Sequence, residues 1–210
     1  MERHSMQTTN SINEHSHNKK VIIIDCGSSK VSELVTLIGD SGHPTTTIKL
    51  VESNLFPFEQ SHSVIISGGP HLFTDSPDKH QSLMAQFEFL KNLEIPTLGI
   101  CLGHQALAII HGGRVYRDIE RREFEPVRTL HKHFLFENLP ANPAFSEDHC
   151  EGIWPSKKMK VLADSEFYET EAIEILSRPM FGVQFHPETS GETGRVLINN
   201  FLSWADQQSY

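Results

Sequence analysis

The sequence has few cysteines, no run of basic residues and no long apolar segment, and each absence excludes a class of protein. It holds three cysteines, Cys26, Cys101 and Cys150, whose odd number without C-x-x-C spacing disfavours a disulfide scaffold and a structural zinc site. No apolar stretch approaches the roughly 20 residues that span a bilayer. The first twenty residues contain no apolar segment of a secretory signal either, so we expect a cytoplasmic protein.

Charge and length narrow the class further. The chain carries 18 Lys and Arg against 27 Asp and Glu, a net charge of −9, which argues against nonspecific binding to nucleic acids or anionic membranes. Its 210 residues are enough for one domain with a substantial core and short for two. No segment has the G-x-x-x-x-G-K-[S/T] pattern of an ATP-binding loop, and no internal repeat occurs. The composition agrees with a soluble intracellular enzyme.

The pattern of apolar residues predicts an α/β fold. Residues 1–19 are polar and rich in Ser, Asn, Thr and His, which is typical of a disordered tail, and we assign residues 20–210 to one domain. Strands and helices then alternate, as in a doubly wound parallel sheet. Strands are expected at residues 21–24, 45–50, 64–67 and 97–100, and helices at 31–38, 82–93 and after residue 101.

The second half of the chain has a different pattern. Shorter strands with turns are expected within residues 114–130 and at 161–163, 173–176 and 181–185, before a closing helix at 192–204. We therefore predict three layers around a mainly parallel sheet with added antiparallel strands. Ligands of such sheets bind beyond the carboxyl ends of the strands, and Gly68, Gly69 and Cys101 follow such ends.

The heptapeptide Gly99–Gln105 (GICLGHQ) carries the strongest local signal. It places Cys101 between a short apolar strand and an apolar helix, in a G-x-C-x-G frame that is the thiol counterpart of the G-x-S-x-G nucleophile elbow. The N–H groups and dipole of a helix N-terminus also favour a thiolate. An isolated cysteine is more often a small buried hydrophobe, but the two glycines favour a nucleophile.

A base for this nucleophile is available near the other end of the chain. In Met180–Glu188 (MFGVQFHPE), an apolar strand ends at His186, and Pro187 forces a turn. Glu188 could then hold one imidazole nitrogen while the other faces Cys101, as in a catalytic triad. By itself the motif is weak, because His186 is one of 13 histidines.

Together, the two motifs resemble those of the class I (triad) glutamine amidotransferase family. His186 follows Cys101 by 85 residues (101 to 186). A third segment, Ser63–Pro70 (SVIISGGP), is similar to the strand and glycine loop that supplies part of the oxyanion hole in this family. The resemblance covers roughly residues 20 to 206, and it implies the three-layer, flavodoxin-like fold of these enzymes.

The resemblance also implies a role for each residue. Cys101 would attack the side-chain amide of glutamine, His186 would transfer the proton to ammonia, and Glu188 would hold the imidazole. A γ-glutamyl thioester would form and then be hydrolysed to glutamate. The backbone N–H groups of Leu102 and Gly69 would stabilise the oxyanion, and no cofactor is implied.

Gln105 is similar to the family's glutamine-binding residue, although a partly buried polar helix residue is the simpler interpretation. The subfamily signals are mixed. The first strand and the SGGP loop look most like GMP synthetases, whereas Leu102 and His104 look more like anthranilate or aminodeoxychorismate synthase subunits and carbamoyl-phosphate synthetases. Glu125 stands where GMP synthetases tend to have a glycine near the glutamine pocket, and it could reshape that pocket.

The family resemblance implies a synthase partner, acting in trans, that receives the ammonia. Three alternatives to a GMP synthetase-like function stay open: an amidotransferase subunit of the anthranilate or aminodeoxychorismate synthase type, a stand-alone hydrolase of γ-glutamyl compounds with a pocket remodelled around Glu125, and a non-catalytic regulatory module. We expect no metal site. Cys150 lies in the segment Glu147–Glu151 (EDHCE), where a metal is disfavoured, and the remaining histidine pairs are interpreted as solvated surface: His15, His17, His131 and His133.

Overall fold

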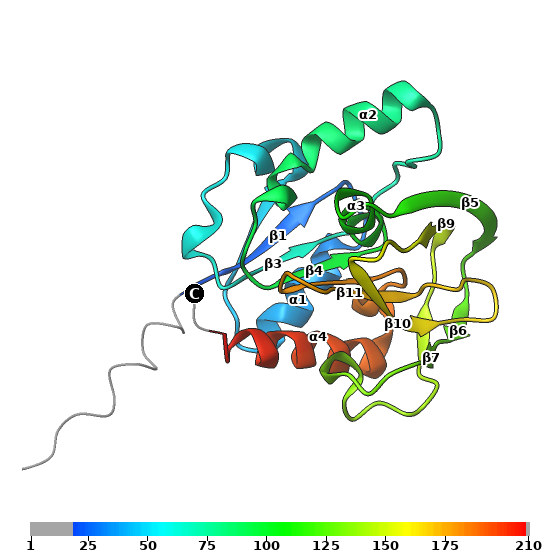
Figure 1. The fold of residues 1–210 in the computed structure, drawn as a ribbon. Coiled ribbons are helices and arrows are strands. Elements are labelled where there is room, and N and C mark those ends of the chain that lie inside the picture. The colour runs from blue at the N-terminus through cyan, green and yellow to red at the C-terminus, as the bar shows by residue number, and fades with distance from the viewer. Residues whose placement is uncertain (1–18, 209–210) are drawn as a thin grey trace, which may run out of the picture.

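One eight-stranded sheet runs through the molecule in the computed structural model, which describes residues 19–208. Its strand order is β2-β1-β3-β4-β12-β11-β10-β7 (Figure 1). The strands from β2 to β12 in this order are parallel, and the others run antiparallel to their neighbours. The strands are β1 Val21–Asp25, β2 Thr45–Lys49, β3 Ser63–Ile66, β4 Thr97–Ile100, β7 Arg128–Thr129, β10 Met159–Asp164, β11 Ala172–Ile175 and β12 Met180–Val183.

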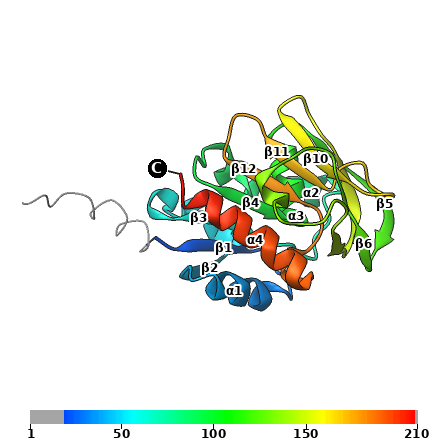
Figure 2. The same ribbon diagram turned by 90° about the horizontal axis from the view of Figure 1, so that it is seen from below.

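Helices cover both faces of this sheet. Helices α1 (Val31–Asp40) and α4 (Gly191–Ala205) lie on one face, and α2 (Pro77–Gln86) and α3 (Leu102–Ile110) lie on the other (Figures 1 and 2). Because both faces are covered, Val21–Ile24 of β1 is buried throughout, as an uninterrupted apolar run requires. This arrangement confirms the predicted three-layer α/β fold.

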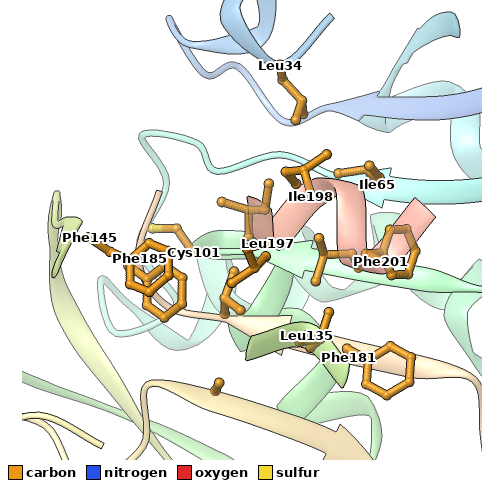
Figure 3. Close-up of a cluster of buried hydrophobic side chains, with 14 of the residues drawn as sticks. Leu34, Ile65, Cys101, Leu135, Phe145, Phe181, Phe185, Leu197, Ile198 and Phe201 are labelled. Atoms are coloured by element: carbon orange, nitrogen blue, oxygen red, sulfur yellow. The ribbon is translucent and has the colours of Figure 1, made fainter. Parts of the chain in front are cut away.

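Two apolar cores result, one on each face. Val21 and Ile23 of β1 pack with α1 and α4, whereas Ile22 and Ile24 pack with α2 and α3. Figure 3 shows the first core, which contains Cys101 at one end. The rings of Phe145 and Phe185 in this core are stacked, with centroids 3.9 Å apart. Cys101 therefore packs against a core of buried apolar side chains.

The second half of the chain adds two small antiparallel sheets beside the carboxyl ends of the parallel strands (Figure 1). One pairs β5 (Arg114–Arg121) with β9 (His149–Trp154), and the other pairs β6 (Phe124–Pro126) with β8 (Ala144–Ser146). Short 3₁₀ helices complete the described chain: η2 Leu50–Leu55, η3 Phe58–Gln60, η4 Glu88–Lys91, η5 Phe134–Phe136 and η6 Pro187–Thr189.

Most predicted elements are present, with three differences. The helix predicted at 82–93 begins at Pro77, because Ser76 caps it and proline suits the first helical turn, and it ends in the 3₁₀ helix Glu88–Lys91. The strand predicted at 181–185 stops at Val183. Strands β8 and β9 are additions that the apolar pattern does not predict.

The predicted disordered tail, residues 1–19, lies outside the described residues apart from Lys19. Within residues 19–208, no helix is both long and apolar enough to cross a membrane.

Candidate active site

Cys101 occupies a strained turn between β4 and α3. Its backbone has φ 50° and ψ −103°, a conformation that non-glycine residues adopt only where the surrounding structure enforces it. The flanking glycines make the turn possible: a Cβ on Gly99 would lie 2.6 Å from the Gly103 backbone, and a Cβ on Gly103 would lie 2.7 Å from the Ile66 carbonyl oxygen. The G-x-C-x-G frame is therefore a steric requirement of this elbow.

His186 reaches Cys101 because of the sheet order. Strand β12 lies parallel to β4, with Val183 opposite Ile100, and the Cys101 N–H donates to the Val183 carbonyl at 2.8 Å. His186 follows three residues after the end of β12. It is held there by its own N–H, which donates to the Ser146 carbonyl at 2.8 Å.

Glu188 orients the imidazole of His186. Pro187 starts the 3₁₀ turn η6, which brings the Glu188 Oε1 to 2.7 Å from the His186 Nδ1. Both side chains are buried, so solvent screens their interaction only weakly. The second nitrogen, Nε2, faces the cysteine side, as both Nε2 and the Cys101 Cβ lie within 3.6 Å of the Cβ position that Gly68 lacks.

Charge pairing dominates the acid–base state of His186. Burial disfavours the charged imidazole, but hydrogen bonds to Cys101 and Glu188, together with their negative charges, raise the pKa of His186 to about 10. The protonated imidazole is thus the stable form of His186 near neutral pH. The geometry brings the three predicted residues, Cys101, His186 and Glu188, together as a triad.

Two backbone segments meet where an oxyanion would form. Leu102 is the first residue of α3, and N–H groups in the first helical turn have no acceptor within the helix. Gly69 packs against both Leu102 and the β1–α1 loop: a Cβ there would lie 3.0 Å from the Leu102 Cδ2 and 2.4 Å from the Cys26 carbonyl oxygen. Gly69 also lines the cavity beside Cys101.

This cavity, of about 530 Å³, is rimmed by charged groups of both signs. Lys30 Nζ and Asp148 Oδ2 are 2.5 Å apart, and Arg122 and Glu120 form a second ion pair at 2.7 Å. Arg117 also lines the cavity. Paired charges of this kind can exchange partners with the ammonium and carboxylate of a free amino acid.

Gln105 lies behind Cys101 and is not among the residues that line this cavity. It is buried, and its amide nitrogen points to the Gln184 side chain at 3.3 Å and to the Glu151 carbonyl at 3.4 Å. Its predicted role in glutamine binding stays a prediction, since in this arrangement its contacts are to the protein.

Glu125 is likewise buried and lies away from the cavity wall. It forms an ion pair with Arg121 and sits on β6, opposite Phe145 of β8. It lines a separate cavity of about 470 Å³. The Glu125 carboxylate is therefore paired with a guanidinium inside the protein.

Sequence analysis missed a group of buried acidic residues in the second half. The Glu151 carboxylate accepts hydrogen bonds from the backbone N–H groups of Phe73 and Thr74, at 3.2 and 2.7 Å, and so ties the loop after Gly69 to β9. Glu147 and Glu171 are also buried. The one sequence signal for this group is the density of charged residues in residues 147–151. Because no apolar pattern accompanies these residues, the sequence does not indicate that they are buried.

Cys101, His186 and Glu188 thus converge at one edge of the sheet in a three-layer α/β fold, the arrangement that a nucleophile, a base and an orienting carboxylate require. Residues 22–204 match the family described as glutamine amidotransferase class-I, and the chain belongs to that family.

Individual relatives agree with this assignment. The chain is 30% identical over 190 residues to one subunit of the GMP synthase (glutamine-hydrolyzing) of Methanocaldococcus jannaschii, covering 86% of this chain and 95% of that protein. It is also 30% identical to GMP synthase (glutamine-hydrolyzing) of Francisella tularensis subsp. novicida, and there it spans 36% of the relative's length. The fold is similar to that of a glutamine amidotransferase from Thermotoga maritima, with a TM-score of 0.77 at 18% identity, covering 91% of this chain and all of the other.

Proposed function

We propose that the protein is the glutaminase component of a GMP synthase-like system: it hydrolyses glutamine and supplies ammonia to a separate synthase in the cytoplasm. The Cys101–His186–Glu188 geometry, in which the Nδ1 of His186 lies 2.7 Å from Glu188, carries this proposal. The similarity to a component of an enzyme named for glutamine hydrolysis supports the choice of substrate.

The reaction begins with attack of the Cys101 thiolate on the side-chain amide carbon of glutamine. The N–H groups of Leu102 and Gly69 would hold the oxyanion, and a donor of this kind typically contributes about 3 kcal/mol. The imidazolium of His186 gives its proton to the leaving nitrogen, and ammonia departs as the thioester forms. Water, deprotonated by His186, then attacks the thioester and releases glutamate.

The charged rim of the cavity suits the rest of the substrate. The α-carboxylate and α-ammonium of glutamine carry one charge of each sign, and the rim offers both, from Lys30, Arg117, Glu120 and Asp148. We infer that these groups bind the amino-acid end of glutamine in this protein.

Labelling with a glutamine-analogue electrophile such as 6-diazo-5-oxo-L-norleucine tests the site, with mass spectrometry of the digested protein as the readout. We expect the modification on Cys101. Cys150 is a matched control, because it lines the same cavity without a histidine base. An unlabelled Cys101 would count against every enzymatic interpretation.

Addition of the ammonia-using synthase together with its substrates tests the partner. The glutaminase rate should rise when both are present. A panel of γ-glutamyl amines separates the alternative function: faster turnover of these amines than of glutamine would favour a stand-alone γ-glutamyl hydrolase.

A further inference from the structure

A second constellation of polar side chains lies buried in the second half of the molecule. Glu147 lies between β8 and β9, His149 begins β9, and Glu171 directly precedes β11. One ligand-type atom from each residue lies within 4.8 Å of the others, and all three residues are buried. The triad does not use any of them.

Four atoms of this cluster have no hydrogen-bond partner among the described residues: both carboxylate oxygens of Glu147, Oε2 of Glu171 and Nε2 of His149. Leaving buried polar atoms unpaired is costly, by about 1 to 3 kcal/mol for each neutral group and more for a charged one. Unpartnered atoms on three side chains whose ligand-type atoms lie within 4.8 Å of one another indicate a missing partner.

His149 has the orientation of a metal ligand. Its Nδ1 lies 3.0 Å from the Glu151 carbonyl oxygen, which can only accept, so Nδ1 carries the hydrogen. With the hydrogen on Nδ1, the neutral ring presents a lone pair at Nε2. A histidine held by a backbone carbonyl through one nitrogen is the usual arrangement when the other nitrogen binds a metal.

The spacing also fits. His149 Nε2 lies 3.0 Å from Glu147 Oε2, and both atoms are hydrogen-bond acceptors when the carboxylate is charged. Two ligand atoms that are each about 2.1 Å from one ion are separated by about 3.0 to 3.4 Å at angles near 90 to 110°. Glu171 is oriented as well, because Ser165 donates to its Oε1 at 2.7 Å.

We propose that Glu147, His149 and Glu171 bind one divalent transition-metal ion of the zinc type. Two carboxylates and one imidazole form a mixed oxygen and nitrogen donor set that suits such an ion, and its charge would offset both carboxylates. Ser165, which donates to Glu171, also lines the separate cavity of about 470 Å³. The ion would fix the segment 146–150, which contributes Asp148 and His149 to the wall of the catalytic cavity. This inference replaces the expectation of no metal site.

Zn²⁺ binding to the full-length chain tests the site. The background is Cys101→Ala with Asp206→Asn, because a thiolate beside His186 could bind zinc and because His43, His62 and Asp206 form another cluster with suitable spacing. After chelator treatment, calorimetric titration should show that this background protein binds one more equivalent of Zn²⁺ than variants that also carry Glu147→Gln or Glu171→Gln. Glu169→Gln, at an exposed neighbouring position, is the control and should keep that equivalent.

Two further readouts complete the test. Zn²⁺ should raise the melting temperature of the background protein, and Co²⁺ should give a visible absorption band that the Glu171→Gln variant lacks. Equal Zn²⁺ stoichiometry in all variants would overturn the proposal. A second pair of results would also overturn it: Zn²⁺ does not stabilise the background protein, and Glu147→Gln is as stable as that background. A proton shared between Glu147 and His149 would then satisfy the buried atoms without a metal ion.

Discussion

The two halves of this protein solve opposite packing problems. The first half, from β1 to α3, buries uninterrupted apolar strands and shapes its site with backbone and glycine: Gly68, Gly69, Gly99 and Gly103 each leave space that a Cβ would fill. The second half buries charge. It encloses four glutamates: Glu125, Glu147, Glu151 and Glu171. Three of them have a hydrogen-bond or ion-pair partner, whereas both carboxylate oxygens of Glu147 have no hydrogen-bond partner among the described residues. The first half supplies Cys101, and the second supplies His186 and one wall of the cavity.

The sharpest test of this division compares the two cysteines at the cavity. Cys101→Ser should reduce glutamine hydrolysis at least about a thousandfold, since the proposed reaction passes through a covalent intermediate on this residue. Cys150→Ser, in the second half, should leave the rate within about threefold. Steady-state ammonia release measures both, and circular dichroism checks the fold. Comparable losses in the two variants would break the comparison.

The base of the second half comes next. His186→Gln should lower kcat about 10²- to 10⁴-fold, the range of general acid–base catalysis. The pH dependence of stability provides a second readout. Because the pKa of His186 is raised from 6.5 to about 10, its protonation stabilises the fold fully below pH 6.5, and this contribution is lost as the pH rises toward 10.

Urea unfolding of wild type and His186→Gln at pH 6 to 10 measures that contribution. The stability advantage of the wild type should shrink across this range, whereas a constant difference would contradict the charged pair. Iodoacetamide alkylation of Cys101 at each pH reports the state of the thiol in parallel.

Glycine substitutions test the backbone argument. Gly103→Ala should destabilise the fold by about 1 to 3 kcal/mol, the usual cost of overpacking, because its Cβ would lie 2.7 Å from a backbone oxygen that cannot turn away. Gly39→Ala in α1 is the control, since nothing lies within 4 Å of its Cβ and alanine favours a helix by about 0.5 to 1 kcal/mol. Denaturant titration measures both. Equal effects would show that the elbow relaxes.

The smallest expected effect concerns the start of α2. Ser76→Ala should cost about 0.5 to 1 kcal/mol through loss of the N-cap, because the Ser76 hydroxyl accepts from the Lys79 N–H at 3.4 Å. Ser82→Ala, at an exposed position inside the same helix, should be neutral or slightly stabilising. Thermal unfolding distinguishes the two variants. An unchanged melting temperature in Ser76→Ala would show that the Ser76 cap does not stabilise α2.

The comparison also explains what sequence could predict. Val21–Ile24 and Thr97–Ile100 were found because parallel strands covered on both faces must be apolar. Strand β9, His149–Trp154, was missed because Glu151 is buried by loop N–H groups from residues 73 and 74, a partner that no local pattern encodes. Cys101 and His186 could be paired in advance because both follow strand ends at one sheet edge and match family motifs.

Other parts of the site depended on distant contacts. The position of Gln105 depends on Gln184, 79 residues away, and the interior direction of Glu125 depends on Arg121. Glu171 joins Glu147 and His149 only after β10 and β11 pair. Side-chain direction at these positions is set by tertiary contacts, so sequence spacing could not predict it.

The place of β12 in the sheet has a consequence for synthesis of the protein. Although β12 is the last strand along the chain, it lies between β4 and β11 in the sheet. The position between these two strands therefore stays empty until β12 and residue 186 have been synthesised. While the ribosome is still producing the chain, Cys101 has neither its base nor the strand that accepts its N–H. We expect the nascent protein to fold its first four strands and release no ammonia, and hydrolysis to begin only when the final strand inserts.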